Sequence, residues 1–406
     1  MTRHSRRKPG LSVVNVCALA RAQIEPKTDY ITQPVIFLSN NQRPAIALTG
    51  SPYHITRPFP ELLPMSDQLR DHQLADWRQH AEQFQDQIRR AVIGMDSAIR
   101  HITLAVFARG HVMLEGDVGV GKTTLLRAVA RALGGAYERI EGTIDLMPND
   151  LIYHTYINQD GKPQVDPGPI LKHGKDLSVF FFNEVNRARP QVHSLLLRIM
   201  AERSVSAFNR EHEFPHLQVF ADRNRVEKEE TFEIPSAARD RFLMELHIEA
   251  PADSALQLDL MFNPRFHDTD RLIAEIQAGV LAYQDLAEIS RVIQAAVHAT
   301  PTLQLYALDL WRATRDPSAF GIKIDGVDMG RLVLAGGSAR GMSMMMRAAR
   351  VSAWLDGRDY LIPEDLQKVF RETVAHRIFF TPVYEMRRTE IIGSLMEGIL
   401  NRVVAP

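Results

Sequence analysis

The middle of the chain alternates short apolar runs with amphipathic patterns of helical spacing. The run Val179-Phe180-Phe181-Phe182 contains no polar position, which is typical of a parallel strand buried on both faces. This alternation predicts an α/β fold in which a parallel sheet is layered with helices. The predicted strands are 112–114, 179–182 and 217–220, and the predicted helices are 123–133 and 190–203.

The pattern changes on either side of this region. Residues 1–75 carry many prolines and no sustained periodicity, so we expect an irregular extension with one short strand at Val35–Leu38. From Ser66 to Val92 the spacing becomes helical and polar. After Pro251 the chain predicts amphipathic helices at 285–299, 342–355 and 363–375. The expected organisation is an extension (1–75), an α/β core (76–250), a linker (251–270) and a mostly helical domain (271–406).

Composition restricts the class of protein. The 406 residues are 45% hydrophobic and carry a formal net charge of -1, so the chain lacks the basic excess that binders of nucleic acid or acidic membranes usually have. Cys17 is the single cysteine, which excludes an intrachain disulfide and a cysteine-built zinc site. No run reaches the ~18 apolar residues of a membrane span. The apolar stretch Leu11–Ala20 is short for an export signal, so we expect a cytoplasmic protein.

One segment fits the pattern G-x-x-x-x-G-K-[ST] between a predicted strand and a predicted helix, namely Gly116-Asp117-Val118-Gly119-Val120-Gly121-Lys122-Thr123. The glycines let backbone N–H groups close around phosphate oxygens, and the helix N-terminus adds partial positive charge. We expect Lys122 to bridge the β- and γ-phosphates of ATP and the Thr123 hydroxyl to ligate Mg²⁺. Thr124 is expected near the α-phosphate.

A nucleotide hydrolase also needs an acidic pair at the end of a neighbouring buried strand. Glu184 follows the 179–182 run and is placed to polarise the attacking water. Asn183 stands where an aspartate is expected to hold Mg²⁺, and losses of this kind often cost about 10–100-fold in metal affinity or rate. Two interpretations follow, a slowed but working hydrolase and a nucleotide-binding switch with little turnover. We favour the first because the rest of the machinery is intact.

Further motifs accompany these two elements. They are Val92-Ile93-Gly94, the run Asn183-Glu184-Val185-Asn186-Arg187-Ala188, Asp240-Arg241-Phe242-Leu243, Gly337-Ser338-Ala339-Arg340, and Gly357-Arg358-Asp359-Tyr360 followed by Pro363-Glu364-Asp365. Together they resemble the MoxR-type AAA+ ATPases, which belong to the helix-two-insert clade of P-loop ATPases, over about 92–378. The resemblance implies an αβα core followed by a helical lid. Val118, Arg225 and Ala339 depart from it, because the family usually has proline at these positions.

The resemblance also implies roles for single residues. Ile93 would lie beside the adenine, and Asn224 occupies the sensor-one position, where an amide orients the attacking water. Arg241 matches the arginine finger, which reaches the γ-phosphate of a neighbouring subunit and stabilises transition-state charge. Arg340 matches sensor two, a lid arginine that contacts the γ-phosphate from within the same subunit and couples hydrolysis to lid motion.

Two predicted hairpins resemble insertions of the same family. Residues 155–165 contain an Asp-Gly turn between extended arms, and residues 204–217 precede the sensor-one strand. In ring ATPases such hairpins lie near the axial pore. The candidate contacts with a client protein are therefore Tyr153, His154, Tyr156 and Lys162.

The function that the resemblance implies is a homo-hexameric ring that binds ATP and Mg²⁺ between subunits, hydrolyses the ATP and remodels a protein client. It also implies a von Willebrand factor A partner. Two alternatives remain open. One is a nucleotide-gated scaffold in which Asn183 has weakened turnover. The other is a nucleic-acid motor, which the near-zero net charge and the lack of an appended DNA-binding motif disfavour.

Overall fold

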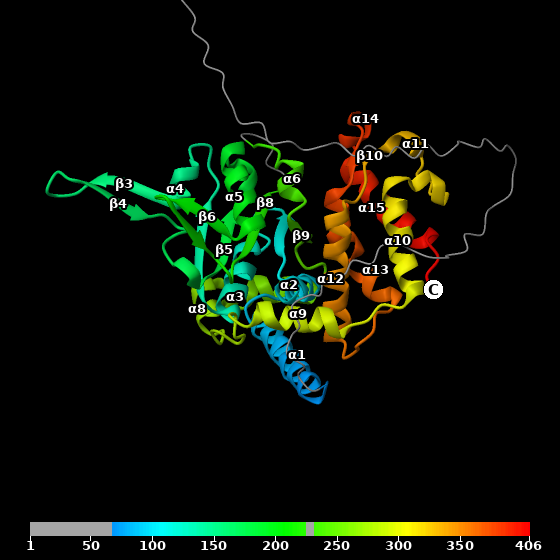
Figure 1. The fold of residues 1–406 in the computed structure, drawn as a ribbon, viewed down its shortest axis with the longest axis horizontal. Coiled ribbons are helices and arrows are strands. Elements are labelled where there is room, and N and C mark those ends of the chain that lie inside the picture. Colours follow the sequence, from blue (N-terminus) through cyan, green and yellow to red (C-terminus); the bar gives the residue numbers. More distant parts are fainter. Residues whose placement is uncertain (1–66, 225–230) are drawn as a thin grey trace, which may run out of the picture. The chain divides into compact units, whose positions relative to one another are not determined.

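A computed structural model describes residues 67–224 and 231–406, with side chains from residue 71 onward (Figure 1). The predicted strand Val35–Leu38 lies outside the described residues. The described residues belong to one compact unit, Leu62–Pro406. Among its described helices, none combines the length and the apolar character that crossing a membrane requires.

The core is a five-stranded parallel sheet with the strand order β2-β5-β8-β1-β9, as the alternating pattern predicts. Its strands are β1 (His111–Gly116), β2 (Ala136–Glu141), β5 (Leu177–Asn183), β8 (Gln218–Asn224) and β9 (Phe242–Ile248). Strands β1 and β5 contain the predicted runs 112–114 and 179–182, and β8 overlaps the predicted run 217–220. Strands β2 and β9 form the two edges and were not predicted, because their charged residues interrupt the apolar pattern.

Strand β5 shows how the sheet separates two hydrophobic cores. All seven of its residues are buried, and their side chains alternate in direction. Val179 and Phe181 pack into one core with three helices, α1 (Asp67–Arg89), α2 (Asp96–Phe107) and α3 (Lys122–Leu133). Phe180 and Phe182 pack into the other core with α5 (Pro190–Glu202). The helices predicted at 123–133 and 190–203 are α3 and α5.

The carboxyl-terminal part is mostly helical, as predicted. Its helices are α9 (Leu286–Ala296), α10 (Pro301–Arg315), α11 (Met329–Leu332), α12 (Ala339–Leu355), α13 (Pro363–Val374), α14 (Pro382–Glu385) and α15 (Arg388–Arg402). Helices α9, α12 and α13 overlap the three predicted helices. Two short strands, β10 (Val333–Ala335) and β11 (Phe379–Phe380), pair antiparallel beside them. We call residues 286–402 the lid.

The segment 251–270 is helical rather than an open linker. It holds α7 (Ser254–Phe262), a 3₁₀ turn (Pro264–His267) and the start of α8 (Thr269–Ala274). The side chains of Asp253 and Asp268 accept backbone N–H bonds and cap α7 and α8. Helix α8 packs against α3, so the segment belongs to the core. At the other end, α1 begins inside the range 1–75 that the sequence assigns to the extension.

Both predicted hairpins are present. Strands β3 (Tyr153–Ile157) and β4 (Pro163–Pro167) follow the short helix α4 (Pro148–Ile152), and β6 (Ser204–Ala207) pairs with β7 (Arg210–Glu213). The β3–β4 hairpin projects from the body of the core (Figure 1). The rings of Tyr153 and Phe208 lie 5.0 Å apart, so the base of the first hairpin contacts the turn of the second.

One carboxylate fastens the lid to the sheet. Asp240 follows α6 (Ser236–Arg239) and accepts bonds from Ser338 Oγ at 2.5 Å, Arg340 Nη1 at 2.6 Å and Arg377 Nε at 3.1 Å. Arg377 is 2% exposed and also donates to the carbonyl oxygens of Phe242 and Leu243. The lid is therefore held where strand β9 begins.

Two residues of the motif at 357–365 form a buried ion pair, and the first prediction tests it. Arg358 donates two bonds to the fully buried carboxylate of Asp365, at 2.6 and 2.7 Å. Arg358→Met leaves that carboxylate without its cation, so we expect the lid to lose about 3 kcal/mol of stability. A thermal melt followed by circular dichroism should show a lower midpoint. Glu364→Gln, on the exposed neighbouring residue, is the control, and an equal midpoint for both variants would contradict the prediction.

Candidate nucleotide site

The glycine segment forms a backbone cradle between β1 and α3. Gly119 and Gly121 have φ angles of 82° and 93°, a left-handed conformation that favours glycine. Helix α3 begins at Lys122, and no side chain caps its first turn. Its free N–H groups and partial positive charge are therefore available to an anion.

Lys122 is buried in this cradle and is held by three neutral oxygen acceptors. Its Nζ atom donates to the carbonyl oxygens of Gly116 at 2.8 Å and Asp117 at 2.9 Å, and to Oδ1 of Asn224 at 2.8 Å. The three bonds fix the position of a positive charge inside the loop. A buried cation fixed in this way suits an anionic ligand.

The bond from Lys122 to Asn224 is the first of a chain of hydrogen bonds that leads to Glu184, the predicted acceptor of the water's proton. Asn224 Nδ2 donates to Glu184 Oε1 at 3.1 Å, and Arg187 Nη1 donates to Glu184 Oε2 at 3.1 Å. Glu184 has a φ of 51°, an uncommon conformation for a residue other than glycine. Strain of this kind is concentrated at functional sites. Residues that are far apart in the sequence thus meet at the carboxyl ends of β5 and β8.

A cavity of about 290 Å³ opens at this point. Its lining includes these predicted site residues: Val118, Gly119, Val120, Gly121, Lys122, Thr123, Thr124, Asn183, Glu184 and Asn224. Gly116 and Asp117 contribute the carbonyl oxygens that hold Lys122. The structure therefore brings together the residues predicted for the phosphates, the metal and the water.

Asp222 lines the same cavity and was missed by the sequence analysis. It is 2% exposed, and its Oδ1 atom accepts the backbone N–H of Glu184 at 2.6 Å. Burial raises the pKa of Asp222 to about 6, although the N–H of Glu184 and the charge of Lys122 oppose the rise. The one signal in the sequence was an aspartate inside an otherwise apolar strand.

A second, apolar cavity of about 230 Å³ shares Gly119, Val120, Gly121 and Thr124 with the first. Ile93 lines this apolar cavity, as expected for a residue beside the adenine. Leu260, Phe266 and Leu272 also line it and were missed, because they lie in or just beyond the segment expected to be a linker. An apolar cavity next to a phosphate cradle suits the flat, apolar faces of a purine.

The predicted arginines are not at this cavity. Arg241 and Arg340 line another cavity, of about 410 Å³, with residues that precede β1. Strands rise about 3.3 Å per residue, so the length of β1 separates this end of the sheet from the phosphate loop by roughly 17 Å. Arg340 is held at this end by Asp240. This structure therefore does not bring Arg340 to the phosphate loop of its own chain.

The cavity around these arginines carries an excess of positive charge. Five arginines line it, namely Arg109, Arg203, Arg241, Arg340 and Arg347, together with one acid, Glu202. Burial lowers the pKa of Arg109 to about 9, and repulsion from Arg203 and Arg347 adds to the effect. Such a surface favours a polyanion.

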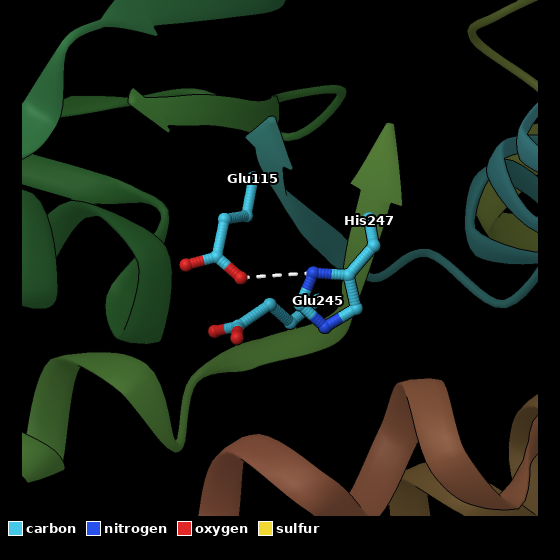
Figure 2. Close-up of side chains that lie close together, drawn as sticks. All are labelled: Glu115, Glu245 and His247. Atoms are coloured by element: carbon cyan, nitrogen blue, oxygen red, sulfur yellow. Dashed lines mark ion pairs between the residues drawn. The ribbon is translucent and has the colours of Figure 1, made fainter. Parts of the chain in front are cut away.

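Figure 2 shows a further cluster, in which Glu115 comes from β1 and Glu245 and His247 come from β9. His247 Nδ1 lies 2.8 Å from Glu115 Oε2. Arg223 Nη2 lies 3.1 Å from Glu115 Oε1 and 3.0 Å from Glu245 Oε1. The arginine supplies the positive charge between the two carboxylates, so this is an ion-pair network that joins three strands beside Gly116 and Asn224.

Comparisons with known proteins agree with this geometry. Protein MoxR of Methylorubrum extorquens is 62% identical to the chain over 336 residues, which are 83% of this chain and 98% of that protein. The chain belongs to the MoxR family of AAA+ ATPases. The ATPase family associated with various cellular activities (AAA) matches residues 111–244, and the AAA lid domain matches residues 332–393.

Two further proteins resemble this MoxR-family chain. Chaperone MoxR1 of Mycobacterium tuberculosis is 30% identical over 78% of this chain and 79% of its own length. The crystal structure of a candidate ATPase from Cytophaga hutchinsonii has a TM-score of 0.71 and 28% identity, covering 84% of this chain and 98% of that one. AAA+ ATPases in general bind ATP with Mg²⁺. The glycine cradle, the buried lysine and the adjoining apolar cavity fit that ligand.

The cradle leads to a prediction for binding. Lys122→Met removes the positive charge that the three oxygens position. Because hydrogen bonds to charged groups contribute about 1.5–3 kcal/mol, affinity for ATP should fall about 10- to 100-fold. Titration with a fluorescent ATP analogue measures the dissociation constant. Lys175→Met, at a lysine whose side chain is 74% exposed, is the matched control. Equal affinities of the two variants would refute the role of Lys122.

Proposed function

We propose that the protein is a ring-forming ATPase in which ATP lies at the seam between two copies of the chain. The observation that carries this proposal is the separation of the two halves of the site. The phosphate loop, Glu184 and Asn224 lie at one end of the sheet, and Arg241 and Arg340 lie at the other. A head-to-tail arrangement of copies joins these two ends and closes as a ring.

The side of the seam that carries the phosphate loop binds ATP and activates the attacking water. Lys122 and the N–H groups of α3 hold the phosphates, and the apolar cavity takes the adenine. Thr123 and Asn183 would hold Mg²⁺, which neutralises charge on the phosphates when it is bound. Glu184 accepts the proton of the attacking water, which Asn224 orients through the bond network that already links them.

The arginine side of the seam completes the site. Arg241 from the neighbouring copy stabilises charge on the γ-phosphate in the transition state, and Arg340 joins it from the lid. The surplus of arginines in the 410 Å³ cavity supports a polyanion at this surface. Asp240 links Arg340 to the core, so loss of the γ-phosphate changes what holds Arg340 and shifts the lid.

The work done by this cycle is the remodelling of a protein client. The β3–β4 hairpin offers exposed side chains for it, including Tyr156 at 44% exposure and Ile157 at 74%. His154 and Lys162 on the same hairpin are exposed as well. The name of the relative Chaperone MoxR1 supports such a role. We further propose a hexamer, a von Willebrand factor A partner and a cytoplasmic location, where ATP is available.

Hydrolysis itself is the first prediction for this function. Glu184→Gln removes the proton acceptor but keeps a group that can accept the Asn224 bond. Steady-state ATP turnover should fall about 100-fold or more, with ATP affinity changed little. Turnover of the natural protein no faster than that of the variant would favour the nucleotide-gated scaffold, in which Asn183 has weakened hydrolysis.

A mixing experiment tests the seam. Glu184→Gln and Arg241→Ala subunits are each inactive alone, because every seam lacks one group. In an equal mixture about a quarter of the seams pair an intact Glu184 with an intact Arg241, so activity should return toward a quarter of the natural level. Mixing Glu184→Gln with Arg331→Ala, at an exposed lid arginine, sets the reference.

Mixing Glu184→Gln subunits with Arg340→Ala subunits tests whether Arg340 acts on the ATP of its own chain or on that of the neighbouring copy. Recovery means that Arg340 acts on the neighbour's ATP. No recovery means that it acts on the ATP of its own chain, because the subunits with intact Glu184 then all lack Arg340. The geometry favours recovery.

A further inference from the structure

The phosphate cavity has an uncharged side chain where a carboxylate is expected. The side-chain N–H₂ of Asn183 donates to Oε1 of Glu141 on the neighbouring strand β2, and Glu141 Oε2 also accepts from Arg139 Nη2 at 2.8 Å. A carboxylate can only accept, so Asn183 must turn its amide nitrogen toward the edge of the sheet. Its carbonyl oxygen remains for the cavity, and that atom carries no full charge.

A carboxylate does occur one strand away. Strands β5 and β8 pair in parallel with Phe182 beside Ala221, so the next residues, Asn183 and Asp222, end their strands side by side. Paired residues of adjacent parallel strands point to the same face, and the strands lie about 4.8 Å apart. Both side chains line the 290 Å³ cavity. Asp222 therefore brings its charge to the same cavity from the adjacent strand.

The bond to Glu184 does not by itself account for an acid at this position. Asp222 Oδ1 accepts the Glu184 N–H at 2.6 Å, and a neutral amide or hydroxyl oxygen could also accept this bond. Asp222 is 2% exposed and lies close to two other acids, Glu184 and Glu141. A buried carboxylate among acids is costly unless a cation balances it. Arg187 pairs with Glu184 and Arg139 pairs with Glu141, so Lys122 is the cation that acts on Asp222. A bound phosphate takes up the charge of Lys122, and Asp222 can then attract a further cation.

We propose that Asp222 supplies the carboxylate that holds the divalent cation of the phosphate cavity, in place of the uncharged Asn183. The inference rests on the ATP-binding function proposed above and says which carboxylate would hold the Mg²⁺ that accompanies ATP. Asp222 would hold the cation through its second oxygen, which is not used by the bond to Glu184. One carboxylate thus fixes the backbone of Glu184 and attracts the cation that Glu184 works beside.

Binding of a fluorescent ATP analogue, titrated with Mg²⁺ and repeated in EDTA, tests this role without relying on turnover. Asp222→Asn keeps an oxygen for the Glu184 N–H and removes the charge. The Mg²⁺ concentration for half-maximal binding should rise about 10- to 100-fold. Binding in EDTA should be unchanged or tighter, because a negative charge beside the triphosphate has gone. A merely structural role would weaken binding in both conditions.

The exchange variant Asn183→Asp/Asp222→Asn/Glu141→Gln moves the carboxylate to the neighbouring strand and replaces the adjacent acid by an amide that can donate to it. Its Mg²⁺ requirement should return to within about threefold of the natural protein, whereas Glu213→Gln, at an exposed acid away from the cavity, should leave the requirement unchanged. Circular dichroism melts confirm that each variant is folded. An unchanged Mg²⁺ requirement in Asp222→Asn, or no recovery in the exchange variant, overturns the inference. Failure of the natural protein to bind ATP overturns the proposed function instead.

Discussion

The position of the lid depends on one partly buried carboxylate. Asp240 accepts bonds from Ser338, Arg340 and Arg377, and Arg377 is itself buried against the start of β9. A buried ion pair of this kind tolerates little displacement, because a shift leaves a charge without its partner. The constraint fixes Arg340 at the end of the sheet opposite the phosphate loop. In the function proposed above, this separation is the physical reason why one copy of the chain holds two half-sites rather than a complete site.

A second constraint acts at the phosphate-loop end of the sheet. In a parallel sheet all strands end at the same edge, so β5 and β8 deliver their last residues to one cavity, beside the phosphate loop that follows β1. Residues at the ends of neighbouring strands contribute to the same site at that edge. The uncharged Asn183 at the end of β5 therefore lies beside the carboxylate of Asp222 near the end of β8.

Much of the fold follows from local patterns. The all-apolar run of β5 predicted a buried parallel strand, and the glycine segment located the junction of β1 and α3. The Asp-Gly turn predicted the β3–β4 hairpin. The edge strands β2 and β9 were missed because their polar residues face solvent or ion pairs. Helices α7 and α8 were missed because their short length hides the periodicity that marks longer helices.

The sequence by itself determined the phosphate cradle and the strand ends, because glycine conformation, a lysine and a helix start are coupled within a few residues. Only the tertiary structure decided which distant residues share a cavity. Asp222 joins Asn183 through strand order, and Leu260 and Phe266 join Ile93 through the packing of α7 and the 3₁₀ turn after it. Arg340 joins Arg241 rather than Lys122 through the docking of the lid. Contacts of this kind depend on how helices and strands pack in space, and no local spacing of residues records that.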